Sequence, residues 1–282
     1  MQNKKKIIKF YKKNGYYIFR NYYKKSIIEE IKNYIFYISS ELYKAKTHKK
    51  IIKYDPKNFD YYVLKSKKEK FSDITSSVYD TCKKLPIFYE IISSKKTLNI
   101  CKNLMRSDKL GILNTGYGFR IDYPKDTYWK ARLHQDYSGQ LGSTNAVVIY
   151  TAFDSITKKK GAPILYSGSH RSGMFDTDLR LKEVKQKKTY DPYHVKIKQR
   201  ELNMFKKIDL VLYERDMAIF DFKLLHESGH NLSNKIRWSA IHRVFDLKHE
   251  SAIKNLFRGG MNEGNFFNKN KKTHIIKIKN AK

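Results

Sequence analysis

Two short stretches that lie far apart in the chain contain the residue types of a mononuclear metal site. His134-Gln135-Asp136 places a His and an Asp two positions apart, and His226 stands much further along. Side chains two apart in a β-strand project from the same face. A second His brought to that face would complete a 2-His-1-carboxylate set, which leaves positions open on non-heme Fe(II) for a co-substrate and O₂. The pattern favours an oxygenase.

Arg237 is the residue expected to hold an acidic co-substrate. It follows His226 by eleven residues, on the next expected strand, and only 11 of the 59 Lys and Arg residues are Arg. A planar guanidinium can bind a carboxylate through a bidentate fork. Because Arg is scarce in this chain, its place after a metal-type His is informative.

The third metal ligand has competitors in His230 and His242. His226 ends an apolar run that resembles a strand, whereas His230 stands between Gly and Asn residues that favour a turn. We therefore expect His226 to be the ligand and His170 to lie in a supporting turn. Taken singly, each His is more often a structural residue, and a lone His-x-Asp is a weak signal.

The net charge of +32 suggests an anionic partner, but the basic residues are mostly Lys and are spread through the whole chain of 282 residues. Readers of nucleic acid rely on Arg forks and clustered basic patches. The abundance of Lys, Ile, Asn and Tyr instead indicates an AT-rich genome. We expect at most weak, charge-driven binding of polyanions.

Cysteine content and hydropathy predict a cytoplasmic protein. Cys82 and Cys101 are too few for a disulfide framework and lack metal-type spacing. No stretch reaches the roughly 18 uncharged apolar residues that cross a bilayer. Near the N-terminus, lysines interrupt the apolar run that a signal peptide would need.

Hydrophobic periodicity predicts a helical N-terminal part, about 1–109, followed by a β-rich core, about 110–246, and an extension at 247–282, all in one domain. Helices are expected at 4–13, 26–43 with a capping-box-like start, 76–92 and 95–105, with a strand at 16–19 and a loop at 45–75. Strands are expected at 117–123, 131–135, 146–153, 163–167, 210–212, 217–222, 238–245 and 274–278. Residues 174–206 form a long insertion. The fold class is mainly β with packed helices, of jelly-roll type.

Several stretches carry a resemblance to a known family, in the family's order. They are 10–16, Leu-His-Gln-Asp-Tyr at 133–137, 146–153, 161–170, and Leu-His-Glu-Ser-Gly-His-Asn at 225–231 followed by Arg237. Together they resemble the phytanoyl-CoA dioxygenase family of Fe(II)/2-oxoglutarate oxygenases. Two supporting turns depart from the family pattern: Ser-Gly-Ser-His at 167–170 replaces Pro-Gly-Ser-His, and Gly-Ala-Pro at 161–163 replaces Gly-x-Leu.

The resemblance implies a double-stranded β-helix, a jelly-roll or cupin-like core with helices packed outside it. It implies that Fe(II) is bound by three residues: His134, Asp136 and His226. It implies that 2-oxoglutarate is held at its distal carboxylate by Arg237 with help from Ser228. Tyr150 and Phe119 are expected to line the co-substrate pocket.

The same resemblance implies hydroxylation of a small molecule, with 2-oxoglutarate decarboxylated to succinate. Relatives that halogenate lack the carboxylate ligand, so the presence of Asp136 favours hydroxylation over halogenation. An anionic substrate is one expectation because the insertion carries basic residues, although such a run is more often a solvated loop. These residues are Arg180, Lys182, Lys185, Lys187 and Lys188. The sequence makes no prediction of the oligomeric state.

Two alternatives remain at this stage. A cupin-like barrel without catalysis would be a binding protein, and it would not bind iron together with 2-oxoglutarate. The net charge instead motivates a nucleic-acid-directed dioxygenase, which would bind DNA or RNA in a focused basic groove and lose affinity as salt rises.

Overall fold

The computed structural model describes residues 2–113, 118–190, 193–260 and 278–279. Its N-terminal part is mostly helical and contains one strand. The elements are α1 (Gln2–Asn14), β1 (Tyr16–Phe19), α2 (Lys25–Thr47), η1 (Pro56–Asn58), α3 (Tyr61–Lys68), α4 (Ser72–Cys82), α5 (Pro86–Ile92) and α6 (Lys95–Met105).

The rest of the described chain consists mainly of strands. Those of the two larger sheets are β2 (Leu110–Ile112), β3 (Gly118–Asp122), β4 (Ala146–Ala152), β5 (Ile164–Ser167), β9 (Lys206–Asp209), β10 (Met217–Asp221), β11 (His226–Glu227) and β12 (Arg237–Asp246). The remaining elements are α7 (Asp136–Gln140), η2 (Ser169–Ser172), β6 (Met174–Phe175), β7 (Thr177–Leu179), α8 (Leu181–Lys185), β8 (Tyr193–Val195), α9 (Gln199–Leu202), α10 (Glu250–Lys254) and β13 (Ile278–Lys279).

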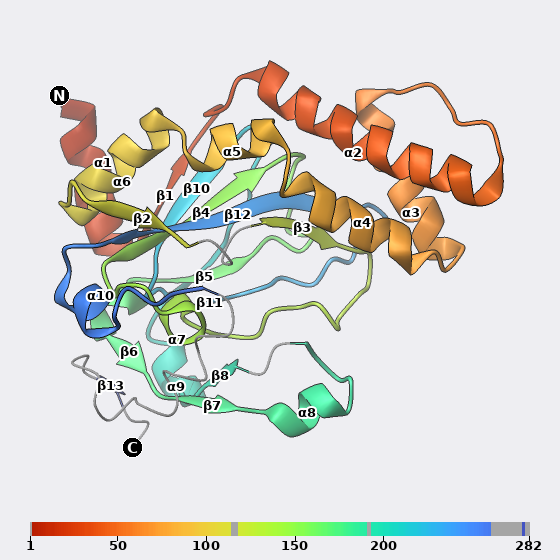
Figure 1. Cartoon of the computed structure of the whole chain (residues 1–282). Helices are drawn as coiled ribbons and strands as arrows, with labels where there is room; N and C mark the ends of the chain where they lie inside the picture. Colours follow the sequence, from red (N-terminus) through yellow and green to blue (C-terminus); the bar gives the residue numbers. More distant parts are fainter. Residues whose placement is uncertain (1, 114–117, 191–192, 261–277, 280–282) are drawn as a thin grey trace.

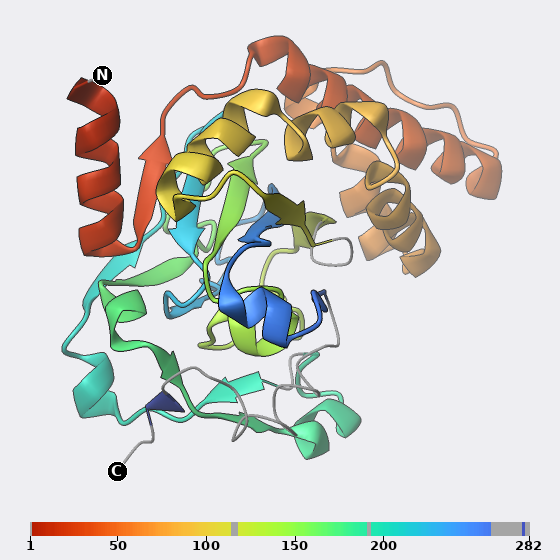
Figure 2. The ribbon, with the colours of Figure 1, turned by 60° about the vertical axis from the view of Figure 1, so that its left-hand side comes forward.

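Two antiparallel sheets form the centre of the fold. The main sheet has the order β1-β10-β4-β12-β2, and β3 also pairs with β12. The second sheet has the order β11-β5-β9. Figure 1 shows α5 and α6 above the main sheet and β5 and β11 below it. Figure 2 shows α1 at the edge of the main sheet, beside β1.

Alternation along the strands divides the main sheet into two faces with separate cores. On β12, Trp238, Ala240 and Val244 pack with the helices in one apolar cluster. The opposite face of the main sheet packs toward the second sheet, and its apolar cluster includes Tyr150 and Phe220. Side chains alternate along a strand, so every second residue of β12 points away from the helices and into the space between the two sheets. That interior contains the chemistry described below.

The helical predictions are largely correct, with two differences. The helix expected at 95–105 is α6, and the one expected at 26–43 is α2, which begins at Lys25 without a side-chain cap. The single helix expected at 76–92 is two helices, because Pro86 stands at the first turn of α5 and the residue before a proline disfavours helical backbone. The loop expected at 45–75 contains α3 and the first turn of α4.

The β-region also differs from the prediction in three places. Residues 131–135 form no strand, and residues 210–212 lie just beyond β9. The insertion at 174–206 folds into short elements, β6 to α9, in place of a plain loop. Of the strands expected at 117–123 and 274–278, residues 117 and 274–277 lie outside the described residues. Within the described part of the chain, no helix is long and apolar enough to cross a membrane.

His242 is a buried polar residue on the helix side of β12, where it pairs with Ile149 across the sheet. Neither of its ring nitrogens has a hydrogen-bond partner among the described residues, and the side chain is fully buried. Burial, followed by the nearby charge of Arg243, lowers the pKa of His242 to about 3. The folded protein therefore holds this ring neutral at pH 7.

We predict that His242→Leu raises the free energy of unfolding by about 1 kcal/mol at pH 7, because an unpaired buried polar ring is replaced by an apolar side chain. Between pH 3 and about 6.5, the unfolded chain binds a proton at His242 that the folded protein excludes. Wild-type stability should thus fall as the pH drops through this window, and the variant should lose less. Urea unfolding at pH 7 and pH 5 measures both effects. The exposed His230→Leu is the matched control, and equal pH dependence in wild type and His242→Leu would contradict the prediction.

Candidate metal centre

His134, Asp136 and His226 meet at one point between the sheets. Each offers one ligand atom, and these atoms lie within 4.8 Å of one another. Nε2 of His134 is 3.4 Å from Oδ1 of Asp136, and the two imidazole ring centroids are 4.1 Å apart. The structure therefore brings together the residues that sequence spacing had singled out.

The backbone joins the two distant stretches directly. The amide of His134 donates to the carbonyl of His226 at 2.9 Å, and the amide of His226 donates back to the carbonyl of His134 at 3.0 Å. This reciprocal pair is an isolated bridge between the loop before α7 and β11. It sets the positions of both imidazoles through main-chain bonds that do not depend on side-chain rotamers.

The side chains of His134 and Asp136 project in the same direction, although residues 131–135 do not form the predicted strand. Gln135 is extended, with φ −118° and ψ 134°, and α7 begins at Asp136. One extended residue between them is enough to point both side chains the same way. Gln135 points elsewhere: its side-chain amide donates to the carbonyls of Gly173 and Lys223, and its oxygen accepts from the amide of Phe175.

Hydrogen bonds to carbonyl oxygens set the tautomer of both imidazoles. Nδ1 of His134 lies 2.6 Å from the carbonyl oxygen of Arg132, and Nδ1 of His226 lies 2.9 Å from that of Leu224. A carbonyl oxygen can only accept, so each Nδ1 carries a hydrogen and Nε2 is the ring nitrogen that can serve as a metal ligand. Burial, then the neighbouring His134, lowers the pKa of His226 to about 3. His226 is therefore neutral at pH 7, as metal binding requires.

Arg243 is a site residue that sequence reasoning missed. Its Nε donates to Oδ2 of Asp136 at 3.0 Å and its Nη2 donates to Oδ1 at 3.1 Å. Burial alone would raise the pKa of Asp136, but Arg243 and the two imidazoles hold it well below its usual range. The spacing of the two arginines could have revealed it. Arg243 follows Arg237 by six residues on the same strand, and side chains an even number of residues apart in a strand point to the same face, here the interior.

The donor set fits a divalent iron. It offers two imidazole nitrogens and one oxygen from a buried anionic carboxylate, the ligand types of the 2-His-1-carboxylate sites. The partners that orient these ligands, two backbone carbonyls and the guanidinium of Arg243, are also in place. Such partners normally fix ligand orientation in metal sites.

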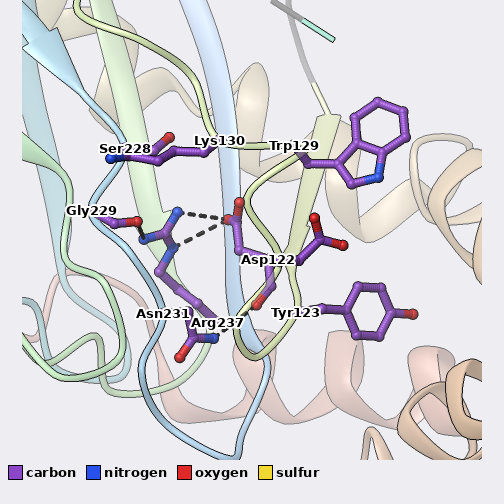
Figure 3. A pocket seen from close by; sticks show the side chains of 9 residues that line it. Asp122, Tyr123, Trp129, Lys130, Ser228, Gly229, Asn231 and Arg237 are labelled. Carbon is purple, nitrogen blue, oxygen red and sulfur yellow. Dashed lines mark hydrogen bonds and ion pairs between the residues drawn. The ribbon is translucent and has the colours of Figure 1, made fainter. Parts of the chain in front are cut away.

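Arg237 begins β12 and lies at a small pocket beside Ser228 and Gly229 (Figure 3). Its side chain is 1% exposed, and its Nε and Nη2 donate to Oδ2 of Asp122 at 3.2 and 3.0 Å. The pocket is lined by Asp122, Tyr123, Asp126, Trp129, Lys130, Ser228, Gly229, Asn231 and Arg237. Its volume of about 10 Å³ is enough for roughly one water molecule.

The other expected pocket residues fall in different places. Ser228 lines the pocket, and its hydroxyl accepts from the amide of Ala131 at 3.2 Å. Tyr150 faces the interior, where the hydroxyl of Ser239 donates to its phenol oxygen at 2.8 Å.

Phe119 lies on the opposite face of the sheet, between Phe88 and Phe153 in the helix-side core. This placement argues against the prediction that it lines the pocket. Its neighbour Arg120 points inward and forms a fork with Asp122, at 2.9 Å from Nη2 and 3.3 Å from Nε.

Comparisons with known proteins agree with this geometry. A model of the phytanoyl-CoA dioxygenase family matches residues 11–239. A search of curated protein sequences gives no match.

Three solved structures illustrate the shared fold. The epimerase SnoN, solved with Fe³⁺, α-ketoglutarate and nogalamycin RO, has a TM-score of 0.58 at 13% identity, over 90% of this chain and 89% of SnoN. EctD from S. alaskensis has a TM-score of 0.58 at 11% identity, over 86% and 76% of the two chains. EvdO2 from Micromonospora carbonacea var. aurantiaca, solved with 2-oxoglutarate, has a TM-score of 0.51 at 12% identity, over 85% and 89%. The predicted fold class, a jelly-roll or cupin-like core with a helical N-terminal third, is confirmed by these likenesses.

We predict that Arg243→Met lowers the free energy of unfolding of the metal-free protein by about 3 kcal/mol, because it leaves the carboxylate of Asp136 buried and unpaired. The double variant Asp136→Leu/Arg243→Met should recover most of that loss, since neither charge then remains. Urea unfolding of the wild type, the two single variants and the double variant gives the coupling free energy between Asp136 and Arg243. Additive losses in the double variant would contradict the ion pair as described.

Proposed function

Because the chain belongs to the phytanoyl-CoA dioxygenase family, we propose that it is a non-heme Fe(II)- and 2-oxoglutarate-dependent dioxygenase that hydroxylates a small molecule. The observation that carries the proposal is the meeting of His134, Asp136 and His226, whose ligand atoms lie within 4.8 Å of one another in an interior that keeps His226 neutral. A barrel used only for binding would not need this arrangement.

Each residue of the site has a separate task in this proposal. His134, Asp136 and His226 hold the iron, and Arg243 orients the carboxylate of Asp136. Arg237 and Ser228 bind the distal carboxylate of 2-oxoglutarate, which places its keto acid end toward the metal. Iron with 2-oxoglutarate and O₂ supplies an oxidant for unactivated C–H bonds, while the co-substrate is converted to succinate and CO₂.

The presence of Asp136 supports hydroxylation as the outcome. With three protein ligands on the iron, no coordination position would remain for a halide beside the keto acid and O₂. The likenesses to SnoN, an epimerase, and SnoK, a carbocyclase, show that one fold carries several oxidative outcomes. The pose of the substrate then decides which bond reacts.

The insertion at 174–206 supports an anionic substrate class. Glu183 of α8 pairs with both Arg132 and Arg180, the latter at 3.1 Å, so this group of three carries one excess positive charge. The amide of Tyr190 donates to the carbonyl of Tyr128 at 3.2 Å. These contacts hold the insertion against the loop that leads to His134. The two arginines are the better candidates because Glu183 fixes both of them, and Arg132 lies two residues before His134.

An anaerobic titration tests the cofactor site. Addition of Fe(II) and 2-oxoglutarate to the metal-free wild type should produce the weak visible charge-transfer band of an iron–keto acid chelate. His226→Ala should abolish the band, because it removes a metal ligand. Arg237→Gln should retain iron but require about 10- to 100-fold more 2-oxoglutarate, since it loses the fork to the distal carboxylate.

The matched controls are His230→Ala and Arg200→Ala, both exposed residues outside the site. They should behave as wild type. A well-folded wild type that gives no band would reject the proposed function, and a band unaffected by both site variants would place the chelate elsewhere.

Substrate charge is tested by neutralising the two arginines. In Arg132→Gln/Arg180→Gln we expect KM for the hydroxylated substrate to rise about tenfold or more with little change in kcat, because a charge-assisted contact in the ground state is lost. Succinate formation with a panel of carboxylates, phosphates and neutral metabolites identifies the substrate first. Lys57→Gln/Lys84→Gln, at exposed positions of the helical part, is the control. An unchanged KM in the arginine variant would reject the anionic class.

A further inference from the structure

The guanidinium of Arg237 already has a carboxylate partner. Oδ2 of Asp122 accepts from its Nε at 3.2 Å and its Nη2 at 3.0 Å, and the carbonyl of Gly229 accepts from Nη1 at 3.4 Å. All three nitrogens are thus engaged, as Figure 3 shows for the pocket. The pocket has a volume of about 10 Å³, whereas a keto dicarboxylic acid needs far more. Co-substrate can therefore take the fork formed by Nε and Nη2 of Arg237 only if Asp122 gives way.

Arg120 is a second guanidinium that binds the carboxylate of Asp122. In β3, Asp122 stands opposite Arg237 of β12, and Arg120 stands opposite Ser239. Nη2 of Arg120 donates to Oδ1 of Asp122 at 2.9 Å and Nε lies 3.3 Å from Oδ2. Arg120 is itself anchored, because Nη2 also donates to the carbonyl of Trp129 at 3.1 Å. Asp122 therefore lies between two guanidiniums and can release one while it keeps the other.

The charges of this cluster favour such an exchange. Two guanidiniums and one carboxylate leave one positive charge uncompensated in a largely buried place, where the side chains of Arg237, Asp122 and Arg120 are 1%, 11% and 23% exposed. Burial would raise the pKa of Asp122, but Arg120 and Arg237 lower it below the usual value, so the group is anionic at neutral pH. The distal carboxylate of 2-oxoglutarate would bring the cluster to zero net charge. Burial of a balanced set is less unfavourable than burial of an unbalanced one.

We propose that Asp122 is a built-in competitor for the co-substrate: its carboxylate occupies Arg237 in the free protein and is held by Arg120 alone once 2-oxoglutarate binds. The inference rests on the proposed function, in which Arg237 takes the distal carboxylate. Asp122 thereby lowers the affinity for 2-oxoglutarate, both by occupying the fork and by repelling a second anion. Arg120 limits this effect because it receives the displaced side chain.

Removal of the competing charge should tighten co-substrate binding. Asp122→Asn keeps the size of the side chain, and we expect the Kd for 2-oxoglutarate to fall about tenfold. Asp122→Ser is a second, smaller uncharged variant that should act in the same direction. Arg120→Gln should have the opposite effect and raise the Kd, because Asp122 then has only Arg237. In the Asp122→Asn background, Arg120→Gln should have little effect, since no carboxylate remains to be received.

The measurement is an anaerobic titration of the protein loaded with Mn(II), followed by calorimetry, with 2-oxoglutarate and then with pyruvate as the probe. Pyruvate has the keto acid end but no distal carboxylate, so its Kd should be the same in wild type and Asp122→Asn. Asp108→Asn is the matched control, because Asp108 is an exposed carboxylate outside the pocket that pairs with Lys248 at 3.2 Å. It should leave the Kd for 2-oxoglutarate within about twofold of wild type.

The outcomes separate this inference from the proposed function. Tighter binding of 2-oxoglutarate, but not of pyruvate, in Asp122→Asn supports the competitor role. Unchanged or weaker binding in both uncharged variants, with normal binding in wild type, overturns it and makes Asp122 an orienting partner of Arg237. If wild type and variants bind Mn(II) but no 2-oxoglutarate, the proposed function and this inference fail together.

Discussion

The site depends on the pair of backbone hydrogen bonds between His134 and His226. These two bonds connect the loop before α7 to the second sheet, and without them the two imidazoles would not share a centre. Main-chain bonds are well suited to this task because they fix position without restricting the rings, which are then oriented separately through Nδ1. The carbonyls of Arg132 and Leu224 complete that orientation. A metal ion would therefore meet ligands that are already placed.

Buried charge is the second constraint on this interior. β12 brings two arginines between the sheets, and each has a carboxylate partner: Asp136 for Arg243 and Asp122 for Arg237. An unpaired ion in such a place would be strongly destabilising. The two pairs differ in their consequences. Arg243 contacts both carboxylate oxygens of Asp136, but each oxygen has a second lone pair that could bind a metal ion. Asp122, by contrast, occupies the guanidinium that we propose as the binding group for the co-substrate.

Much of the fold could be predicted because its signals are local. The period of apolar residues located α6 to the residue, and turn residues separated the strands correctly at β4, β5, β10 and β12. The strand expected at 131–135 failed for a tertiary reason: only His134 finds a partner strand there, and one bridge does not make a ladder. Pro86 divided a helix whose apolar pattern runs on without a break.

The three residues proposed as metal ligands could be found from the sequence, whereas the residues around them could be found less well. His-x-Asp, a distant His and a following Arg are linear features that spacing reveals. Arg243 and Asp122 matter only through partners that the fold supplies. Phe119 shows that a one-residue error in a strand places a side chain on the wrong face of the sheet, because neighbouring side chains point to opposite faces. Arg120 and Asp122 face the interior, and Phe119 faces the helices.

A crystal structure of the protein grown anaerobically with Mn(II) and 2-oxoglutarate tests the central claim most directly. The account predicts one metal ion bound by Nε2 of His134, Nε2 of His226 and a carboxylate oxygen of Asp136, with the distal carboxylate of the keto acid at Arg237. A metal ion bound elsewhere, or 2-oxoglutarate bound away from Arg237 with these three side chains unligated, would contradict it.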